Sequence, residues 1–497
     1  MQLNLSHISY TYPGAALAAV DDVTLTLPQG WTGVIGDNGA GKSTLAHLAT
    51  GDLAPDAGLV GPRLFAAYCA QDSSAAPDTL YDFAADWGRA ARRLREALAL
   101  EEEWLYAYDE LSGGQRKRVQ VACALWQEPD VLVMDEPTND LDAPACEAVA
   151  CALELFGGIG LLISHDRALL DRLAAQCVVV SGGRASLHSG GFSQVEAALA
   201  GERAARERRR ENARREVGRL AAEARRRGEE ASRAAGKRSR AQLDARDSDG
   251  RERIGRAIVS GKDGVAGKLS ATMDRRLARA SERLASTRTE KRYTASLHRY
   301  GAVARIPTVA HLPAETLRRG DFCLHVPELW VGSRDRIALT GRNGAGKSVL
   351  TGRLLEEVPS SVPTAYLPQE VGPALRERAL AMLHDSDRAL RGRILSLVGS
   401  MNTDPDKLLD GHDISPGELR KIVLAGELLR EPALLVLDEP TNHLDIGSIL
   451  ALQELLESFP GALVLVTHDA ALSEVVAATE WHISRAGNES ALAVRNR

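Results

Sequence analysis

The sequence lacks the features of a membrane-spanning, exported or metal-cluster protein. No apolar run among its 497 residues approaches the ~18 residues that cross a bilayer, and the amino terminus has no basic stretch followed by an apolar one. The six cysteines are scattered without CxxC spacing or a companion histidine cluster, which argues against a metal site or an iron–sulfur cluster. We therefore expect a soluble cytoplasmic protein whose cysteines are buried free thiols.

Net positive charge is also scarce, except in one segment. The chain carries 61 Lys and Arg against 67 Asp and Glu, a net charge of -6. Residues 201–300 alone hold 29 basic and 15 acidic residues, a net of +14, which leaves -20 for the remainder. Because Lys and Arg gather against phosphate backbones and release counterions there, we expect this segment to meet a polyanion. The alternative is a charged helix that is merely solvated.

The same basic segment has the composition of a helical hairpin. Residues 202–246 are rich in Ala, Arg and Glu and contain no proline, which favours a long solvated helix. Glycines and turn formers at 247–268 favour a loop or a broken helix, and helical spacing returns from 269 to about 296. We predict an antiparallel pair of helices with its tip at 247–268. A collapsed or disordered linker is the alternative.

A phosphate-binding pattern follows a short apolar strand at 31–35. Residues 36–44 read GDNGAGKST, which is G-x4-G-K-[ST] between a strand and a helix. The glycines let backbone N–H groups close around phosphates at a helix N-terminus, Lys42 neutralises β- and γ-phosphate oxygens, and Ser43 can hold Mg²⁺. The pattern predicts a phosphate-binding loop.

Further motifs follow in a fixed order. Asp135 and Glu136 end an apolar strand; we expect the first to bind Mg²⁺ and the second to position or deprotonate water. Before them, Ser112 and two glycines in the signature segment at 111–115 open a basic helix with free N–H donors. His165 follows another apolar strand, and taken alone it would more often be a structural histidine.

The second half repeats this series, which indicates a duplicated domain. The two lysines are 305 residues apart, the two glutamines 298, and the other pairs 303. We predict domains at 1–200 and 301–497, with the basic segment at 201–300 between them. The corresponding pairs are Lys42 and Lys347, Gln71 and Gln369, Ser112 and Ser415, Asp135 and Asp438, Glu136 and Glu439, and His165 and His468.

These motifs resemble those of an ATP-binding-cassette ATPase over residues 1–200 and about 305–490. The resemblance implies an α/β fold of two P-loop cassette domains, each a mixed sheet flanked by helices, joined by the long antiparallel hairpin. ATP and Mg²⁺ are the implied cofactors. It also implies that Tyr12 stacks on adenine, with Tyr10 as the alternative. Gln71 would sense Mg²⁺ and the γ-phosphate, and His165 would contact the γ-phosphate.

The site residues carried over by this resemblance fall into three groups. The expected catalytic residues are Glu136, Glu439, His165 and His468. The expected Mg²⁺ ligands are Ser43, Gln71, Asp135, Ser348, Gln369 and Asp438. The expected ATP contacts are Tyr12, Gly36, Asn38, Gly39, Gly41, Lys42, Ser43, Thr44, Gln71, Ser112, Gly113, Gly114 and Gln115 in the first copy, and Gly341, Asn343, Gly344, Gly346, Lys347, Ser348, Val349, Gln369, Ser415, Gly417 and Glu418 in the second.

The second copy departs from the first in its signature segment and in its phosphate loop. Pro416 stands where the first copy has Gly113; proline fits the first turn of a helix but has no N–H to donate. Gly417 keeps its N–H, so we expect contact with phosphate to survive. Val349 replaces Thr44, which removes one hydroxyl beside the metal-binding serine.

The adenine contact of the second copy is open, because no convincing aromatic residue corresponds to Tyr12. His311 and Phe322 are candidates, or no residue fills this role. Cassettes of this family pair head to tail, which would bring Lys42 to Ser415 and Lys347 to Ser112 in two composite sites. We expect the two sites to hydrolyse ATP unequally because of the proline in one signature segment.

Tandem cassettes, the absence of a span and the charged linker resemble the ABC-F class of ribosome-associated ATPases. In that class the ATP-closed protein occupies the ribosomal exit site and the linker points towards the peptidyl-transferase centre, where rRNA and tRNA phosphates suit basic side chains. Only about 40 residues separate Gln71 from Ser112, too few for the helical arm of housekeeping members. The chain therefore resembles the antibiotic-resistance branch, acting as a monomer. Direct collision with the drug and reshaping of rRNA are both open.

Three alternative functions are open, and the sequence argues against two of them. A ribosome-associated translation factor without a resistance role would share all of these motifs. The tandem ATPase subunit of a membrane transporter would not need a basic hairpin of 100 residues. A DNA-maintenance ATPase inserts its helices within a cassette, whereas here the helices lie between two complete copies.

Overall fold

The computed structural model describes residues 1–139, 141–236, 264–286, 300–409 and 414–496. The chain divides into two compact units, one formed by Met1–Val195 with Arg292–Arg497 and the other by Glu196–Lys291. The first unit holds both copies of the repeat, here called the first and second domains. Within the described ranges, no helix is long and apolar enough to cross a membrane.

The first domain is built on a six-stranded sheet of order β5-β6-β7-β3-β8-β9. The strands from β5 to β8 are parallel, and β9 pairs antiparallel with β8. β6 and β7 are apolar runs that are buried at every position, as is typical of parallel strands covered on both faces. A smaller sheet has the order β2-β1-β4. The strands are β1 (Gln2–Tyr10), β2 (Val20–Pro28), β3 (Gly30–Ile35), β4 (Ala57–Gly61), β5 (Ala66–Cys69), β6 (Val131–Asp135), β7 (Ile159–Ile163), β8 (Ala174–Ser181) and β9 (Arg184–Ser189).

Helices of the first domain begin where the predicted motifs lie. Parallel strands place their carboxyl ends at one edge of the sheet, so the segments after β3, β5, β6 and β7 converge there. The bounds of its helices are α1 (Lys42–Thr50), α2 (Leu80–Ala85), α3 (Arg89–Ala97), η1 (Glu102–Leu105), η2 (Tyr108–Glu110), α4 (Gly113–Trp126), α5 (Ala143–Leu153) and α6 (Arg167–Leu173).

The second domain repeats this architecture around an eight-stranded sheet of order β11-β12-β19-β18-β14-β17-β16-β15. β14 to β18 form the parallel part, and β10 pairs only with β13. The strands are β10 (Thr308–Leu312), β11 (Glu315–Arg319), β12 (Phe322–Val326), β13 (Leu329–Gly332), β14 (Arg336–Gly341), β15 (Thr364–Leu367), β16 (Leu434–Asp438), β17 (Ala462–Val466), β18 (Thr479–Ala486) and β19 (Glu489–Asn496). The helices are α10 (Lys347–Glu356), α11 (Pro373–His384), α12 (Arg388–Ser400), α13 (Pro405–Leu409), α14 (Pro416–Leu428), α15 (Ile446–Ser458) and α16 (Ala470–Val476).

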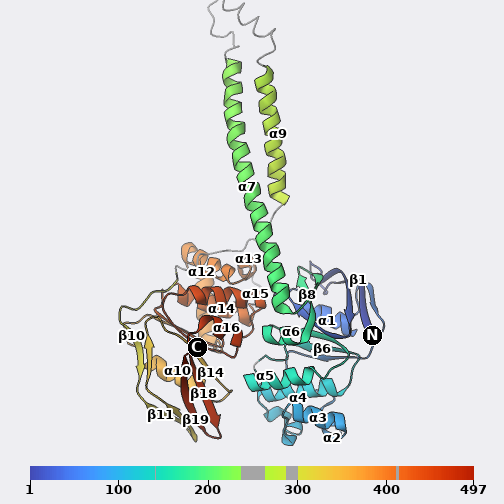
Figure 1. Cartoon of the computed structure of the whole chain (residues 1–497), viewed down its shortest axis with the longest axis vertical. Helices are drawn as coiled ribbons and strands as arrows, with labels where there is room; N and C mark the ends of the chain where they lie inside the picture. The colour runs from blue at the N-terminus through green and yellow to red at the C-terminus, as the bar shows by residue number, and fades with distance from the viewer. Residues whose placement is uncertain (140, 237–263, 287–299, 410–413, 497) are drawn as a thin grey trace, which may run out of the picture. The chain divides into compact units, whose positions relative to one another are not determined.

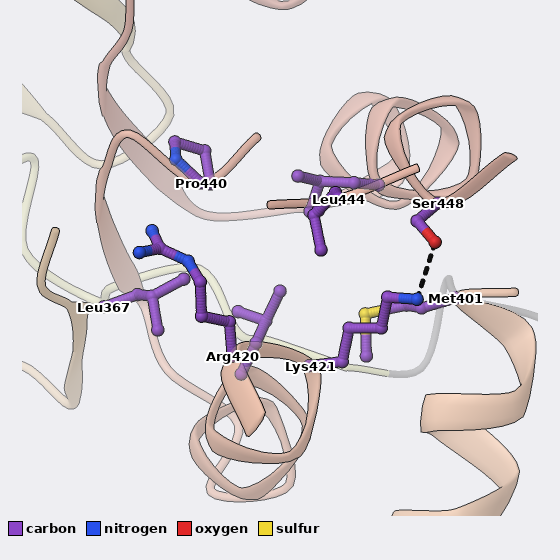
Figure 2. A pocket seen from close by; sticks show the side chains of 9 residues that line it. Leu367, Met401, Arg420, Lys421, Pro440, Leu444 and Ser448 are labelled. Atoms are coloured by element: carbon purple, nitrogen blue, oxygen red, sulfur yellow. Dashed lines mark hydrogen bonds between the residues drawn. The ribbon is translucent and has the colours of Figure 1, made fainter. Parts of the chain in front are cut away.

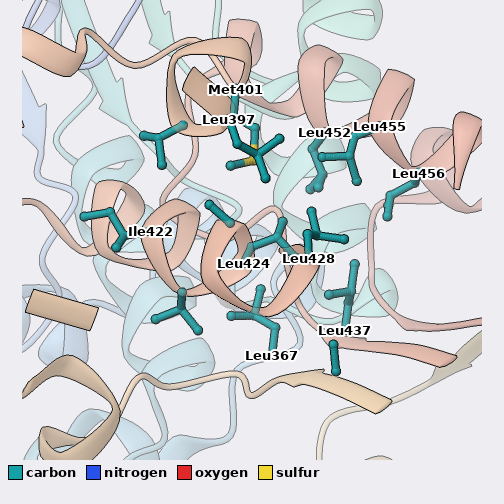
Figure 3. Packing of buried hydrophobic residues seen from close by; sticks show 14 of the residues in the cluster. Leu367, Leu397, Met401, Ile422, Leu424, Leu428, Leu437, Leu452, Leu455 and Leu456 are labelled. Carbon is teal, nitrogen blue, oxygen red and sulfur yellow. The ribbon is translucent and has the colours of Figure 1, made fainter. Parts of the chain in front are cut away.

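Helix α14, which begins at the second signature segment, runs through a hydrophobic core. Figure 3 shows Ile422, Leu424 and Leu428 of this helix packed among leucines of α12, α15 and the sheet. Leu428 is fully buried. Burial of this helix on nearly all sides fixes the position of its N-terminus, since each fully buried leucine contributes about 1.5–3 kcal/mol.

The second unit contains two long helices, α7 (Phe192–Gly236) and α9 (Gly264–Ser286), which lie side by side in Figure 1. Ala224 of α7 and Met273 and Ala280 of α9 are buried, whereas most residues of α7 beyond 200 are exposed. Together the two domains and the helical pair confirm the predicted α/β fold with a helical linker.

The predicted limits of these helices need two corrections. α7 begins ten residues before the predicted start at 202, because Phe192 and Val195 are buried and Asp171 accepts a hydrogen bond from the Ser193 backbone N–H at 2.8 Å. At the predicted tip, residues 247–263 lie outside the described residues, and 264–268 form the start of α9 instead of a loop. Each glycine there costs only about 1 kcal/mol in a helix, which the strongly helical sequence that follows offsets. The predicted stretch 287–296 also lies outside the described residues.

Candidate functional site

The phosphate loop of the first domain joins β3 to α1 at the edge where the parallel strands end. Gly41, the N-cap of α1, has a φ of 102°, and a Cβ there would lie 2.4 Å from the Ala19 carbonyl oxygen, so only glycine fits. Lys42 Nζ donates to the Gly36 carbonyl at 2.9 Å and to the Asp37 carbonyl at 3.1 Å. Burial lowers the pKa of this lysine. The other predicted contacts of the loop, Asn38, Gly39, Ser43 and Thr44, lie on the same turn and on the first turn of α1.

Two of the three predicted metal ligands of the first domain, Ser43 and Asp135, lie together. Ser43 Oγ donates to Asp135 Oδ2 at 3.1 Å, which joins the first turn of α1 to the end of β6. The Tyr68 hydroxyl on β5 donates to the same oxygen at 2.6 Å. A hydroxyl and a carboxylate are oxygen ligands of the kind Mg²⁺ takes, so this donor set fits the ion.

Both predicted bases occupy strained backbone positions, each directly after a predicted metal ligand of its own domain. Glu136 and Glu439 have φ angles of 49° and 45°, in the left-handed region that non-glycine residues rarely adopt. Burial raises the pKa of Glu136 to about 8 and that of Glu439 to about 7. A carboxylate with its pKa near neutrality is suited to accept a proton from water.

The two predicted histidines contact these glutamates. The His165 backbone N–H donates to Glu136 Oε2 at 3.3 Å, and the His468 N–H donates to Glu439 Oε2 at 3.2 Å. Burial lowers the pKa of His165 to about 3 and that of His468 to about 4, so both rings are neutral at pH 7. The rings are therefore hydrogen-bonding groups rather than cations.

The lysine of the second phosphate loop is held differently. Lys347 Nζ donates to the Gly341 carbonyl at 2.8 Å and lies 2.6 Å from His468 Nε2, which also lies 3.1 Å from Asn343 Oδ1. Ser348 is exposed on the first turn of α10, Val349 beside it is half-buried, and Asp438 is buried at the end of β16. The described hydrogen bonds include none between Ser348 and Asp438.

The two signature segments form the same helix start. Ser112 and Ser415 are the N-caps of α4 and α14, and each forms a capping box with the residue three positions later, Gln115 or Glu418. A Cβ at Gly113 would meet no atom within 4 Å, whereas one at Gly417 would lie 2.4 Å from the His443 carbonyl oxygen. The position of Gly113, which Pro416 occupies in the second domain, therefore has space for a ring. The position after it, Gly417, has no space for a side chain. Gly114 occupies that next position in the first domain.

Both predicted glutamines follow the edge strands β5 and β15 and have exposed side chains. Their backbone carbonyls are held from the signature helices. Lys117 Nζ donates to the Gln71 carbonyl at 2.9 Å, and Arg420 Nη1 donates to the Gln369 carbonyl. Sequence reasoning missed Lys117 and Arg420, as it missed Tyr68. Comparison of the two copies would have found them: Lys117 and Arg420 occupy equivalent positions, and Tyr68 lies 298 residues before Tyr366, the separation of the glutamines.

The predicted adenine contacts differ between the domains. The Tyr12 hydroxyl lies 3.1 Å from Thr44 Oγ1 on α1, and its ring meets Tyr10 edge-on at 5.1 Å. Phe322 lies against the second phosphate loop, because a Cβ on Gly346 would be 2.9 Å from its ring. His311 instead stacks on Trp330 and bonds to Glu328. Of the two candidates in the second domain, only Phe322 is brought to the loop.

Hydrogen bonds also join the two domains at their phosphate loops. The Asn38 backbone N–H donates to Asp445 Oδ2 at 3.2 Å, and the Asn343 N–H donates to Asp142 Oδ2 at 3.2 Å. Asp142 is the N-cap of α5, which follows β6, and Asp445 is the N-cap of α15, which follows β16. Asn402 Nδ2 donates to Asp37 Oδ1 at 2.9 Å as well.

The fold and the two phosphate sites define an ATP-binding-cassette ATPase with two cassettes on one chain. The family model described as ABC transporter matches residues 20–139 and 324–442. The tylosin resistance ATP-binding protein TlrC of Streptomyces fradiae is 31% identical over 94% of this chain and 94% of its own. The ribosome protection protein VmlR of Bacillus subtilis is 28% identical over 93% of this chain and 83% of its own. Among solved structures, the RNase-L inhibitor has the same fold, with a TM-score of 0.63, 18% identity and coverage of 98% and 90%.

The chain belongs to the ABC-F class of ATP-binding-cassette ATPases, as the resemblance of its motifs predicted. It is an enzyme that binds ATP and hydrolyses it to ADP and phosphate.

Proposed function

We propose that this protein is an ATP-dependent ribosome-binding factor that protects the ribosome from antibiotics. The observation that carries the proposal is the match, over 94% of both chains, to a protein named for resistance to tylosin. A second relative that covers 93% of this chain is named a ribosome protection protein. Both matches include the linker as well as the cassettes, since the cassettes alone are a smaller share of the chain.

The charge of the linker segment, residues 201–300, supports a ribosomal partner. Residues 201–300 carry 29 Lys and Arg against 15 Asp and Glu, whereas the rest of the chain is acidic. Along α7, exposed arginines recur on several turns. They include Arg206, Arg208, Arg209, Arg214, Arg215, Arg219 and Arg225. An rRNA cavity presents dense phosphates that such a surface contacts without reading sequence, so the linker is the part that enters the exit site towards the peptidyl-transferase centre.

ATP binding supplies the driving force in this proposal. One composite site joins Lys42 and Glu136 to Ser415, and the other joins Lys347 and Glu439 to Ser112. Closure on two ATP molecules fixes the geometry of the linker, and hydrolysis reopens the interface and releases the factor. Ser43 and Asp135 would hold Mg²⁺ in one site and Ser348 and Asp438 in the other, and the ion would supply positive charge against the phosphates.

Sedimentation of a hydrolysis-deficient variant tests ribosome binding. The Glu136→Gln, Glu439→Gln double variant should cosediment with 70S ribosomes through sucrose when ATP is present, and remain at the top of the gradient without nucleotide. Lys42→Ala and Lys347→Ala in the same background provide the control that does not close. Recovery with membranes or DNA, and not with ribosomes, would support a transporter subunit or a DNA-maintenance ATPase instead.

Drug protection is tested separately at the linker. Replacement of residues 247–268 with a short Gly/Ser loop should leave ATP hydrolysis intact and abolish rescue of in vitro translation from a macrolide. A variant that still cosediments with ribosomes but no longer rescues translation would assign protection to the linker end. Undiminished rescue would remove this segment from the mechanism. Ribosome binding by the parent chain without rescue from any drug tested would favour a translation factor without a resistance role.

A further inference from the structure

Helix α14 carries two adjacent buried basic residues that have different partners. Figure 2 shows Arg420 and Lys421 projecting from this helix beside Pro440 and Leu444, around a cavity of about 10 Å³. Lys421 Nζ donates to the Thr403 hydroxyl at 2.7 Å and to the Ser448 hydroxyl at 2.6 Å. Within the described part of the chain, Arg420 instead donates to three backbone carbonyls. The two residues are 4% and 6% exposed, so neither guanidinium nor ammonium is solvated.

Arg420 bonds to two segments of the second ATP site, one that contains Gln369 and one that contains Asp438 and Glu439. Its Nη2 donates to the Asp438 carbonyl at 2.9 Å and to the Glu439 carbonyl at 2.7 Å, and its Nη1 donates to the Gln369 carbonyl. A guanidinium presents several donors in a rigid plane, so it can fix carbonyls of separate segments relative to one another. The helix that supplies it begins at Ser415 in the signature segment.

The anchored turn is a strained one. Glu439 has a φ of 45°, in a region that non-glycine residues rarely adopt, so this conformation persists only where its surroundings determine it. The Glu439 N–H donates to Val466 at 2.8 Å, and the Arg420 guanidinium holds the carbonyl on the other side of the residue. Backbone contacts on both sides fix the direction in which the carboxylate leaves the chain.

The first domain lacks this connection. Lys117, at the equivalent position of α4, donates to the carbonyls of Ala70 at 2.7 Å and Gln71 at 2.9 Å, and to the Gln120 side chain at 3.0 Å. Among the described residues, no hydrogen bond joins Lys117 to the carbonyl of Asp135 or Glu136. A single ammonium therefore holds the glutamine segment only, although Glu136 has the same left-handed backbone.

We infer that Arg420 is a positioning residue of the second ATP site, which ties the Gln369 segment to the turn that carries Glu439 and thereby orients this carboxylate for hydrolysis. Among the described residues, the first site has no equivalent of this tie. The inference rests on the proposed role of Glu439 as the base, and it is independent of ribosome binding.

The test changes Arg420 to the residue of the first domain. Arg420→Lys preserves the charge and can still hold the Gln369 carbonyl, as Lys117 does in the first site, but cannot reach all three carbonyls. In the Glu136→Gln background, where turnover depends on Glu439, it should lower kcat about tenfold while KM for ATP changes less than twofold, since a misplaced catalytic group slows chemistry more than binding. Arg430→Lys, an exposed substitution just beyond the same helix, should change neither constant.

A second background separates positioning from damage to the helix. In the Glu439→Gln variant, where turnover depends on Glu136, Arg420→Lys should leave kcat within twofold. Equal losses in both backgrounds, a rise in KM that matches the loss of kcat, or an unchanged kcat in the Glu136→Gln background would each overturn the inference. The proposed role of the glutamates is judged apart from it, by whether the Glu136→Gln, Glu439→Gln double variant loses turnover.

Discussion

The two ATP sites should respond differently to pH, because their glutamates are buried in different surroundings. Burial raises the pKa of Glu136 to about 8. Burial also raises the pKa of Glu439, to about 7. Here the positive charge of Lys347, which faces the carboxylate, opposes the rise in pKa. Single Glu136→Gln and Glu439→Gln variants isolate the second and the first site in turn. If the glutamates are the bases, each variant reports the ionisation of the one that remains.

The sign and size of the effect follow from the need for a deprotonated base. Turnover rises with pH through the pKa of the glutamate, so the Glu136→Gln variant should reach half its maximum near pH 7 and the Glu439→Gln variant near pH 8. At pH 7.5 the deprotonated fractions are about three quarters for Glu439 and about one quarter for Glu136, a threefold difference. At pH 6 the difference grows to about tenfold.

The assay is kcat/KM for ATP between pH 5.5 and 9.5, because this constant reports the ionisations of the free enzyme. Each profile is normalised to its own plateau at high pH, which removes any difference in intrinsic rate. Ionisation of ATP affects both variants equally and cancels in the comparison. Superimposed profiles, or a higher midpoint for the Glu136→Gln variant, would refute the assignment of these glutamates as the bases or the reasoning from burial.

The Glu136→Gln substitution should also change the stability of the fold, by an amount that depends on pH. Because the pKa of Glu136 is higher in the folded chain than its ordinary value of 4.5, the folded state binds more protons than the unfolded state between these values. The carboxyl group therefore destabilises the fold as pH rises from about 4.5 to 8, by about 1.4 kcal/mol for each unit. Glu136→Gln should raise the Tm relative to the parent at pH 8 and have little effect on it at pH 5.

Two further predictions concern packing and the contact between the domains. Gly160→Ala should lower the free energy of unfolding by about 1–3 kcal/mol, because its Cβ would lie 2.3 Å from the buried Trp31 ring. Gly157→Ala should be nearly neutral, because a Cβ there would meet no atom within 4 Å. Thermal unfolding compares the two variants. Asp445→Asn should lower Tm further than Asp142→Asn. Both carboxylates accept a backbone N–H of the other domain, but Asp445 faces the buried Lys421, whereas Asp142 pairs with the exposed Arg342 at 3.9 Å. Equal shifts in calorimetry would contradict this.

The sequence was sufficient for the parts of the fold and site that local physics fixes. The phosphate loops need glycine at positive φ, and each follows a short, largely apolar strand, so pattern and spacing located both. The capping boxes at Ser112 and Ser415 follow from a serine and a Gln or Glu three residues later. The start of α7 could not be read in the same way, because Phe192 joins the helix through burial against the first domain rather than through propensity.

Contacts between segments far apart in the chain could not be predicted from the sequence. Nothing in the residues around Tyr68 shows that its hydroxyl meets Asp135, 67 positions later, because that contact depends on adjacent parallel strands. Arg420 likewise looks like an ordinary helical arginine until its partners are known. Only comparison of the two copies marks such positions, through residues that recur at equivalent places.

The differences between the domains fall where the structure leaves room for them. Pro416 replaces a glycine whose neighbourhood is open, whereas Gly417 must stay glycine because the His443 carbonyl lies 2.4 Å from where a Cβ would be. Arg420 replaces a lysine at a position that already holds the glutamine segment, and its extra donors reach the catalytic turn. We therefore expect the duplicated scaffold to constrain the groups that shape phosphate binding, and changes at neighbouring positions to alter how each site orients the proposed base. Unequal hydrolysis is therefore expected from several small substitutions acting together, and it should persist in part when any one of them is reversed.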